Sequence, residues 1–353
     1  MRRKVRLATW LERWGMMSLL RALPDLAGRQ LRVLNYHRIF DAPGGADFPF
    51  DRGLISATPA QFREQMVHVK SHYDPIRFSD LFNWMEHRRA LPKRPILITF
   101  DDGHADNYTH AFPILRELDI PAAIFVSTQY IDSGELFWFE SVAHTIMEAK
   151  PGSYRLPGNF GFMDISDAES RRKAIERVLA HIKTLDDAAR VAVVAGLKTL
   201  MVPGSPDDTA LAGALTWDQI REMAKQGIEF GSHSVSHPIL TKLDDATLAH
   251  ELTSSLQTLK RELGTCLDVL AYPEGSTSAF NARVVDATRR AGYRLGLSYV
   301  SGTNLLRRFD PFGVKRMHID ASLPAVQFRA LLAMPQLFSL ELSHPRAQES
   351  LAP

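Results

Sequence analysis

The stretch that decides the fold is Ile96–Leu97–Ile98–Thr99–Phe100–Asp101–Asp102–Gly103, an apolar run that ends in two acids and a glycine. Such a run is typical of a strand buried on both faces of a parallel sheet. Because parallel α/β folds carry their sites at the carboxyl ends of strands, we expect both carboxylates to face that site. Adjacent acids repel each other and need a cation or a shared proton, whereas helix capping is the alternative role for this pair.

Similar β-type runs alternate with helical patterns along most of the chain. The expected strands are Leu31–Asn35, Ile96–Phe100, Ala122–Val126, Ile228–Gly231, Val269–Tyr272 and Leu295–Ser298. The expected helices are Pro59–His72, His110–Leu118, Trp217–Gln226, Asp245–Leu263 and Ala279–Ala291, with Thr216 and Gln219 as a capping box for one of them. This alternation indicates a parallel α/β fold, either open or closed.

Residues from about 140 to 215 break the alternation. Ser166 and Glu169 match a capping box. An apolar stripe at helical spacing follows, made of Ile175, Val178, Leu179, Ile182 and Leu185. We therefore expect a helical insertion, which either covers the mouth of the site or serves only in packing.

The second chemical motif is Gly231–Ser232–His233–Ser234–Val235–Ser236–His237–Pro238. Two histidines four residues apart after a strand match a two-imidazole metal site, although a lone histidine is more often a hydrogen-bonded polar residue. Together with one carboxylate of the acidic pair they provide three ligands and leave a position for water, which is the catalytic pattern. The third motif, Ala271–Tyr272–Pro273–Glu274–Gly275–Ser276, indicates by itself only a turn, but such a loop can aim a backbone N–H at an oxyanion.

The three motifs together resemble the polysaccharide deacetylase family, the family-four carbohydrate esterases that include chitooligosaccharide deacetylases. Looser matches occur at Asn35–Arg38, Phe137–Phe139 and Leu215–Trp217, so that the resemblance runs from about residue 31 to 320. It implies an α/β fold in the form of a distorted (β/α) barrel of seven or eight parallel strands.

The resemblance also implies a role for each matching residue. Asp102, His233 and His237 would bind a metal, and Asp101 would be the general base. The loop of Pro273, Glu274 and Gly275 would support the oxyanion. Either His318 or His37 would be the catalytic acid, because both follow strand-like segments.

Two positions depart from the family pattern. Ala271 stands where many members carry an arginine that steadies the base, and Glu274 replaces a tyrosine. The usual Asp–Trp motif is not found after the third motif.

We expect metal-dependent hydrolysis of the acetamide of N-acetylated sugars in a poly- or oligosaccharide, with release of acetate. Zinc is the expected metal, and Co²⁺, Ni²⁺ or Mn²⁺ also suits the ligands. The alternatives are a catalytically impaired deacetylase-like domain that binds glycan, and an amidase that acts on a small non-sugar amide.

Composition excludes several other classes of protein. The 353-residue chain has a formal net charge of only +2, which gives no support to nucleic-acid binding, and its single cysteine, Cys266, permits no disulfide framework.

We expect His104 to be a loop histidine in contact with solvent. Four aromatic residues, Trp138, Phe139, Trp217 and Tyr272, are expected in the core rather than as sugar-stacking platforms.

The chain is expected to divide into an amphipathic helical segment at 1–30, a deacetylase barrel at 31–325 and a C-terminal tail at 326–353. The basic start is followed by an apolar stretch that Glu12, Arg13 and Arg21 interrupt, which does not match a secretory signal. Residues 1–24 would dock on the domain or lie against an anionic membrane surface. We therefore expect a cytoplasmic protein, with the inner membrane surface as a site of peripheral contact and an N-acetylated glycan or lipid-linked sugar as substrate.

Overall fold

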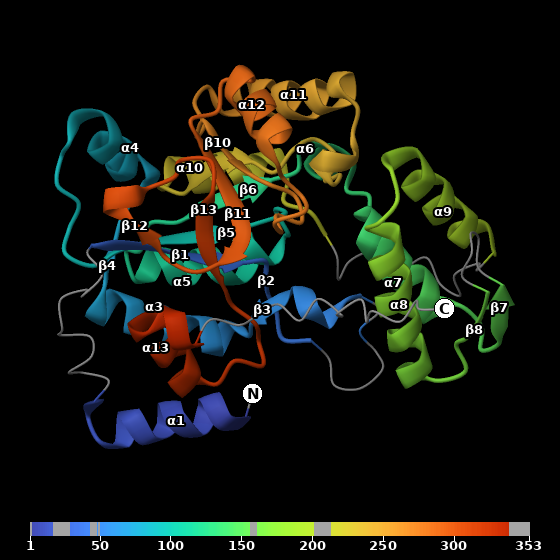
Figure 1. The fold of residues 1–353 in the computed structure, drawn as a ribbon, viewed down its shortest axis with the longest axis horizontal. Coiled ribbons are helices and arrows are strands. Elements are labelled where there is room, and N and C mark those ends of the chain that lie inside the picture. The colour runs from blue at the N-terminus through green and yellow to red at the C-terminus, as the bar shows by residue number, and fades with distance from the viewer. Residues whose placement is uncertain are drawn as a thin grey trace, which may run out of the picture.

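A closed barrel of seven parallel strands forms the centre of the molecule (Figure 1). The computed structural model describes residues 2–16, 29–42, 48, 50–155, 161–200 and 213–338. The barrel strands are β1 (Gln30–Tyr36), β5 (Pro95–Phe100), β6 (Ala123–Val126), β9 (Glu229–Ser232), β10 (Val269–Ala271), β11 (Leu295–Ser301) and β13 (Val314–His318). Because β1 pairs with both β13 and β5, the order β1-β13-β11-β10-β9-β6-β5 closes on itself. The barrel expected from the family resemblance is thereby confirmed.

The register of the strands places the site. Asn35 lies opposite Thr99 on β5 and opposite His318 on β13, so three strand ends meet beside Asp101. All six residues of β5 are buried, as its unbroken apolar sequence predicts. Short strands extend the barrel or lie beside it, namely β4 (Asp74–Pro75), β12 (Asn304–Leu305), and the pair β2 (Arg38–Ile39) and β3 (Ile55–Ala57).

Helices surround the barrel (Figure 1). They are α3 (Pro59–His72), α4 (Phe78–His87), α5 (Phe112–Glu117), α6 (Thr128–Ser133), α10 (Trp217–Lys225), α11 (Asp245–Leu263), α12 (Ala282–Arg290), α13 (Ala325–Ala333) and α14 (Pro335–Phe338). The expected capping box at the start of α10 is present, with Thr216 and Gln219 each satisfying the other's backbone N–H.

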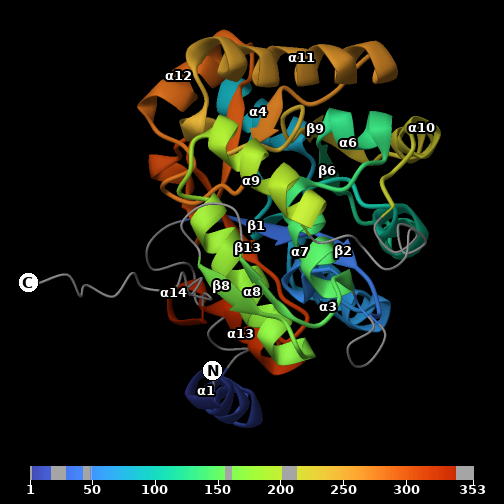
Figure 2. The same cartoon turned by 90° about the vertical axis from the view of Figure 1, so that its right-hand side faces the viewer.

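The insertion expected at about 140–215 lies to one side of the barrel (Figure 1), and this side faces the viewer in Figure 2. It contains α7 (Trp138–Glu148), the hairpin β7 (Ser153–Arg155) and β8 (Phe162–Asp164), α8 (Ala168–Ile182) and α9 (Asp187–Leu200). Val178 and Ile182 of the predicted stripe belong to a hydrophobic cluster separate from those of the barrel. The predicted capping box at Ser166 was wrong by one residue, because the Asp167 carboxylate accepts the Ser170 N–H instead. The hairpin was not predicted.

Both ends of the described chain pack together. Helix α1 (Arg2–Arg13) contacts α13, whose Phe328, Leu331 and Leu332 are buried in the main core. Residues 325–338 therefore belong with the barrel, unlike the expected tail, because their apolar side chains complete its outer layer. Residues 17–28, which continue the amphipathic pattern, and 339–353 lie outside the described residues. None of the helices described has both the length and the apolar character needed to cross a membrane.

Candidate active site

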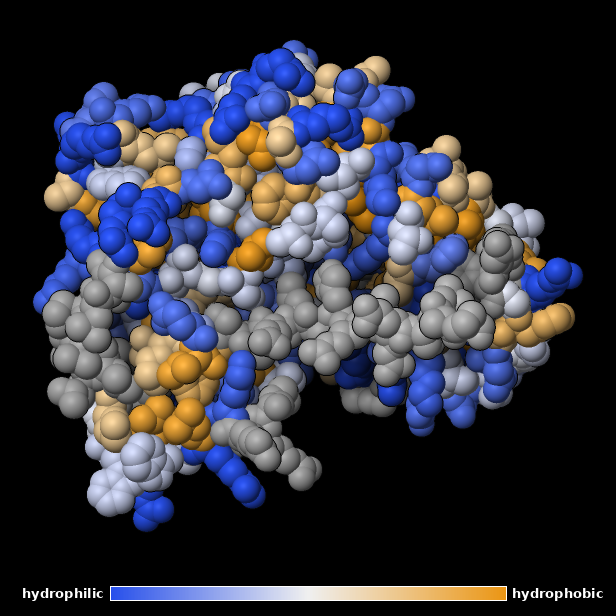
Figure 3. Space-filling view, viewed as in Figure 1, coloured by the Kyte–Doolittle hydropathy of each residue, from blue (hydrophilic) through white to orange (hydrophobic). Residues whose placement is uncertain are grey.

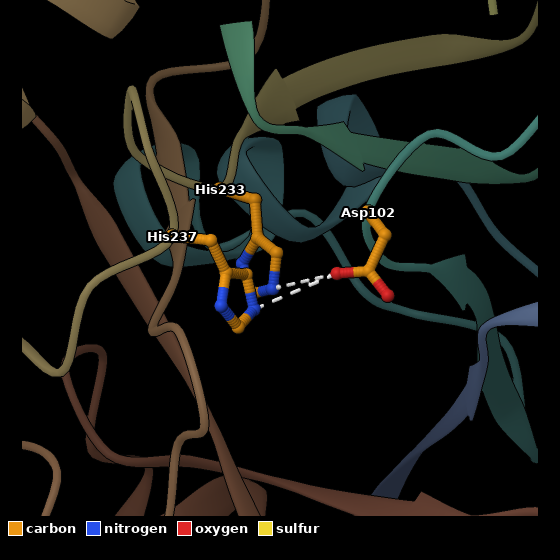
Figure 4. Close-up of side chains that lie close together, drawn as sticks. All are labelled: Asp102, His233 and His237. Carbon is orange, nitrogen blue, oxygen red and sulfur yellow. Dashed lines mark ion pairs between the residues drawn. The ribbon is translucent and has the colours of Figure 1, made fainter. Parts of the chain in front are cut away.

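Asp102, His233 and His237 converge at the carboxyl ends of β5 and β9 (Figure 4). The Nε2 atoms of His233 and His237 lie 3.5 and 3.6 Å from Asp102 Oδ1. The potential ligand atoms of the three side chains all lie within 4.8 Å of one another, and all three residues are buried. The convergence expected from the second motif and the acidic pair is therefore observed.

Neighbouring residues fix the two imidazoles. His233 Nδ1 is 2.8 Å from the Ala271 carbonyl, which accepts its proton and leaves Nε2 facing Asp102. The Trp138 indole donates to the His237 carbonyl at 3.1 Å. Between the histidines, the Glu251 carboxylate accepts the backbone N–H groups of Val235 and Ser236. Helix α11, which carries Glu251, thus holds the histidine loop against the barrel.

The side chains present fit a divalent cation. Both carboxylate oxygens of Asp102 are buried without a hydrogen-bond partner, an arrangement that is costly unless a cation compensates it. Burial alone would raise the pKa of Asp102, but the surrounding histidines, His104 first, hold that pKa well below its ordinary value. Burial also lowers the pKa of His237 to about 3, so its imidazole is neutral, as a metal ligand must be.

Asp101 forms a buried bidentate ion pair with Arg316 of β13. The two guanidinium–carboxylate distances are 2.7 and 2.8 Å, and Arg316 also donates to Asn35 Oδ1 at 2.8 Å. Burial raises the pKa of Asp101, but Arg316, together with His233 and His37, outweighs burial and lowers the pKa below its ordinary value. Ala271 is fully buried where the family resemblance implied an arginine, so a different strand supplies the cation. One signal for this partner is present in the sequence, because Arg316 is a charged residue within a strand-like segment.

The two candidate acids both line the cavity above the acidic pair. Their rings lie 6.1 Å apart, and the Tyr299 hydroxyl contacts His318. Burial lowers the pKa of His37, while Asp102 and Asp101 oppose that shift. Burial, His37 and Arg316 lower the pKa of His318 to about 3, opposed by Asp101.

Only part of the third motif reaches the cavity among the described residues. Tyr272, Glu274 and Ser276 line it, but Pro273 and Gly275 do not. The Gly275 N–H donates to the Pro273 carbonyl at 2.6 Å, so this donor is already engaged within the loop. A Cβ at Gly275 would lie 2.7 Å from the Tyr299 backbone nitrogen, which explains the glycine. The oxyanion role of Pro273, Glu274 and Gly275 stays a prediction.

His104 was wrongly expected to face solvent. Its side chain is fully buried beneath Asp102, with Nε2 3.4 Å from Asp102 Oδ2. On its other side, Nδ1 lies 3.2 Å from the Tyr130 hydroxyl and 4.0 Å from Oε1 of Glu140, which belongs to α7 of the insertion. Asp102 and Glu140 raise the pKa of His104 against the effect of burial. A short loop after β5 turns the imidazole inward, which sequence spacing does not reveal.

The site opens into a cavity of about 740 Å³ that the insertion helps to enclose. Trp138 and Phe139 of α7, Leu179 of α8, and Lys183 at the end of α8 contribute to its wall. The insertion therefore covers part of the mouth, one of its two expected roles. Trp138, Phe139 and Tyr272 line this cavity rather than lying only in the core, whereas the Trp217 indole donates to Asp132 instead.

Left-handed backbone is concentrated in the site loops. Four of the six non-glycine residues with positive φ in the described chain are Asp102 (75°), Ser234 (67°), His237 (57°) and Glu274 (60°). Such conformations cost free energy and persist where the surroundings enforce them, commonly at functional sites. They aim two of the predicted ligands, a feature invisible in the sequence.

Comparisons with known proteins agree with this geometry. The family model of polysaccharide deacetylase matches residues 88–296, more than half of the chain. The poly-beta-1,6-N-acetyl-D-glucosamine N-deacetylase of Staphylococcus epidermidis is 24% identical over 259 residues, covering 65% of this chain and 82% of that protein. The protein of the same name from Staphylococcus aureus is 31% identical over 105 residues, covering 28% of this chain and 36% of its own.

Solved structures show the same fold. The deacetylase PplD of Streptococcus pyogenes, in complex with acetate, has a TM-score of 0.57 at 18% identity and covers 88% of this chain and 99% of its own. IcaB from Ammonifex degensii has a TM-score of 0.54 at 18% identity, and the match covers 87% of this chain and 97% of IcaB. The chain therefore belongs to the polysaccharide deacetylase family.

Proposed function

We propose that the protein is a metal-dependent N-deacetylase that hydrolyses the acetamide of N-acetylated sugar residues in a poly- or oligosaccharide and releases acetate. The observation that carries the proposal is the pairing of two adjacent acids with different surroundings. Asp102 faces two imidazoles, while Asp101 is held by Arg316. Asp102 is therefore suited to binding a cation, and Asp101 is suited to accepting a proton.

Asp102, His233 and His237 would hold the metal, with zinc preferred and cobalt, nickel or manganese also suited to these ligands. A bound divalent ion lowers the pKa of a coordinated water and polarises an amide carbonyl. Asp101 would accept the proton of the attacking water, because Arg316 keeps it ionised and fixes both of its oxygens.

His37 is the better candidate for protonating the departing amine. Burial lowers the pKa of both imidazoles, but both site carboxylates oppose that shift at His37, whereas only Asp101 opposes it at His318. A proton on the amine converts it into a viable leaving group. His318, in contact with Tyr299, would then shape the cavity wall.

Two observations favour a polymeric glycan over a small amide. A second hollow of about 460 Å³, lined in part by Phe40 and Arg52, shares Asp320 and Ser322 with the main cavity. The two together provide room for neighbouring sugar units. The curated relatives named above act, by their names, on poly-β-1,6-N-acetylglucosamine, which is the first polymer to test.

The Arg316–Asp101 pair also argues against the catalytically impaired alternative. That alternative rested on the missing arginine at Ala271 and on the altered third motif with Glu274. Arg316 supplies an equivalent cation to the base and so removes the first of these two grounds.

The decisive experiment measures acetate released from N-acetylglucosamine oligomers, from the polymer and from a small N-alkyl acetamide. We expect release from the sugars, its loss with chelator and its return with Zn²⁺ or Co²⁺. Release that survives chelation and verified metal removal would refute metal dependence. Preference for the small amide would favour the amidase, and no release from any substrate would favour a binding domain.

Asp101→Asn tests the assignment of the base. The amide cannot accept a proton, so we expect kcat to fall about 10²–10⁴-fold. Metal content should stay unchanged, since the three predicted ligands remain. A near-normal rate at saturating metal would mean that another group is the base.

A further inference from the structure

The exposed face of α1 carries large apolar side chains that the barrel does not cover. Leu7 and Trp10 of the helix are 45% and 52% exposed, and Trp14, in the turn directly after it, is 68% exposed. The Trp14 backbone N–H still donates to the Trp10 carbonyl, and the two indole rings lie 6.5 Å apart. The spacing of three and four residues places them on one stripe of the helix. We infer that α1 seats the protein on an anionic lipid surface, with Leu7, Trp10 and Trp14 entering the interface.

The helix is fixed in this orientation from its other side. Ala8 and Leu11 are buried against the domain, and Glu12 forms an ion pair with Arg329 of α13 at 2.6 Å. Rotating α1 to bury the tryptophans would break this pair and expose the two buried residues. The apolar stripe is therefore held outward, where tryptophan is suited to the boundary between lipid and water.

Charge identifies the kind of surface. The 3.6-residue period places Arg6 and Arg13 on the stripe next to the tryptophans, on the side away from Leu11. Both arginines are exposed. Within Arg2–Arg13 the one acid is Glu12, which Arg329 engages. An apolar stripe bordered by cations is the pattern of a helix that lies on anionic lipid.

The exposed apolar stripe of Leu7, Trp10 and Trp14 lies near the cavity of the candidate site. Lys4, one turn before Leu7, belongs to the cavity wall together with the predicted ligands. In the space-filling view, orange and pale groups gather at the lower left over α1 and α13 (Figure 3). Binding there would bring the cavity close to the lipid surface. Resting on the proposed function, this arrangement favours an N-acetylated sugar carried on a lipid over one free in solution.

The test uses the full chain and vesicles of phosphatidylglycerol with phosphatidylcholine, compared with phosphatidylcholine alone. We expect sedimentation with the anionic vesicles at low salt, release at high salt, and a blue shift of tryptophan emission. Trp10→Ala with Trp14→Ala should abolish the shift and weaken binding more than tenfold. Arg6→Gln with Arg13→Gln should also weaken binding more than tenfold, since each basic residue contributes about fivefold.

Matched controls are Phe162→Ala with Val191→Ala and Arg155→Gln with Arg172→Gln, exposed pairs on the insertion that should bind like the parent. Equal binding to both vesicle types, or full binding by the tryptophan variant, would overturn the inference. So would a tryptophan-dependent dimer in light scattering, since a second copy would then cover the stripe. Acetate release from soluble oligomers without vesicles should be equal in all variants, which separates this test from that of the proposed activity.

Discussion

At the scale of single residues, the site depends on separating two neighbouring carboxylates. Asp101 and Asp102 follow one another on the chain, yet the left-handed backbone of Asp102 turns it toward the histidines. Arg316 forms an ion pair with Asp101 from β13, which is separated from β5 in the barrel by β1. The acidic pair and the histidines were predictable from the sequence because they form contiguous motifs. Arg316 was not predicted as the partner, since 215 residues separate it from Asp101.

Arg316→Gln should move the acidic limb of the kcat/KM profile to higher pH. In the parent, Arg316 lowers the pKa of Asp101, so the base stays ionised below the ordinary carboxyl range. Without the cation, burial, which is the largest influence on this carboxyl, raises its pKa. Breaking the buried pair should also cost about 3–5 kcal/mol in the free energy of unfolding at neutral pH.

Arg316→Lys is the matched control for this prediction. Lysine keeps the charge but loses the bidentate geometry. The kcat/KM profile of this variant against pH should therefore lie between those of the parent and Arg316→Gln. Because the pKa of folded Asp101 is depressed, the pair's contribution to stability should be present at neutral pH and lost as the pH falls through that pKa. Superimposable profiles for all three proteins would mean that Arg316 does not tune the base.

His104→Phe should weaken metal binding about 10–100-fold, the usual effect of losing a group that orients a ligand. The imidazole lies between Asp102 and Glu140, so its loss frees the carboxylate that faces the two histidines. The measurement is metal affinity by competition with a chromophoric chelator. His250→Gln, an exposed residue of α11, is the control. Unchanged affinity in the His104 variant would limit that residue to a packing role.

At the scale of elements, the sequence predicted most of the barrel. The strands found were those with mainly apolar runs, because burial on both faces leaves a strong composition signal, although Arg32 lies within the first and Glu229 within the fourth. Strand β13 was not among them, since Lys315 and Arg316 interrupt its pattern. In the folded barrel Lys315 is exposed while Arg316 turns inward to Asp101. The segment before His318 was recognised only as strand-like, because the adjacent charges of Lys315 and Arg316 break its apolar pattern.

The insertion should unfold as a unit of its own. Ile182→Ala removes a fully buried side chain from the insertion's separate core, at an expected cost of about 2–5 kcal/mol. Calorimetry of this variant should resolve two unfolding transitions. Only the transition of the insertion should move to lower temperature, while that of the barrel stays unchanged. Leu252→Ala, in a different buried cluster beneath α11, should instead shift the main transition. One common transition for both variants would show that the insertion and barrel unfold together.

At the scale of the whole molecule, the expected location in the cytoplasm, at the inner membrane surface, stays a proposal. It predicts that the full chain fractionates with membranes at low salt and leaves them at high salt. A variant lacking residues 1–24 should stay in the soluble fraction at every salt concentration. Recovery of the protein outside the cytoplasm would overturn the proposed location, even if lipid binding were intact.

The closure of the barrel by β1 has a consequence for the newly made protein. This strand is synthesised early, but its partner β13 ends near residue 318. At synthesis rates of ~5–20 residues per second, β1 waits roughly 15–60 s on the ribosome with one edge unpaired. An open edge of this kind invites pairing with other chains. Asp101 lacks its arginine for a shorter interval, roughly 11–43 s at the same rates, because 215 residues separate the two side chains. The carboxylate proposed as the base therefore has no ion-pair partner until the last strand of the barrel is made.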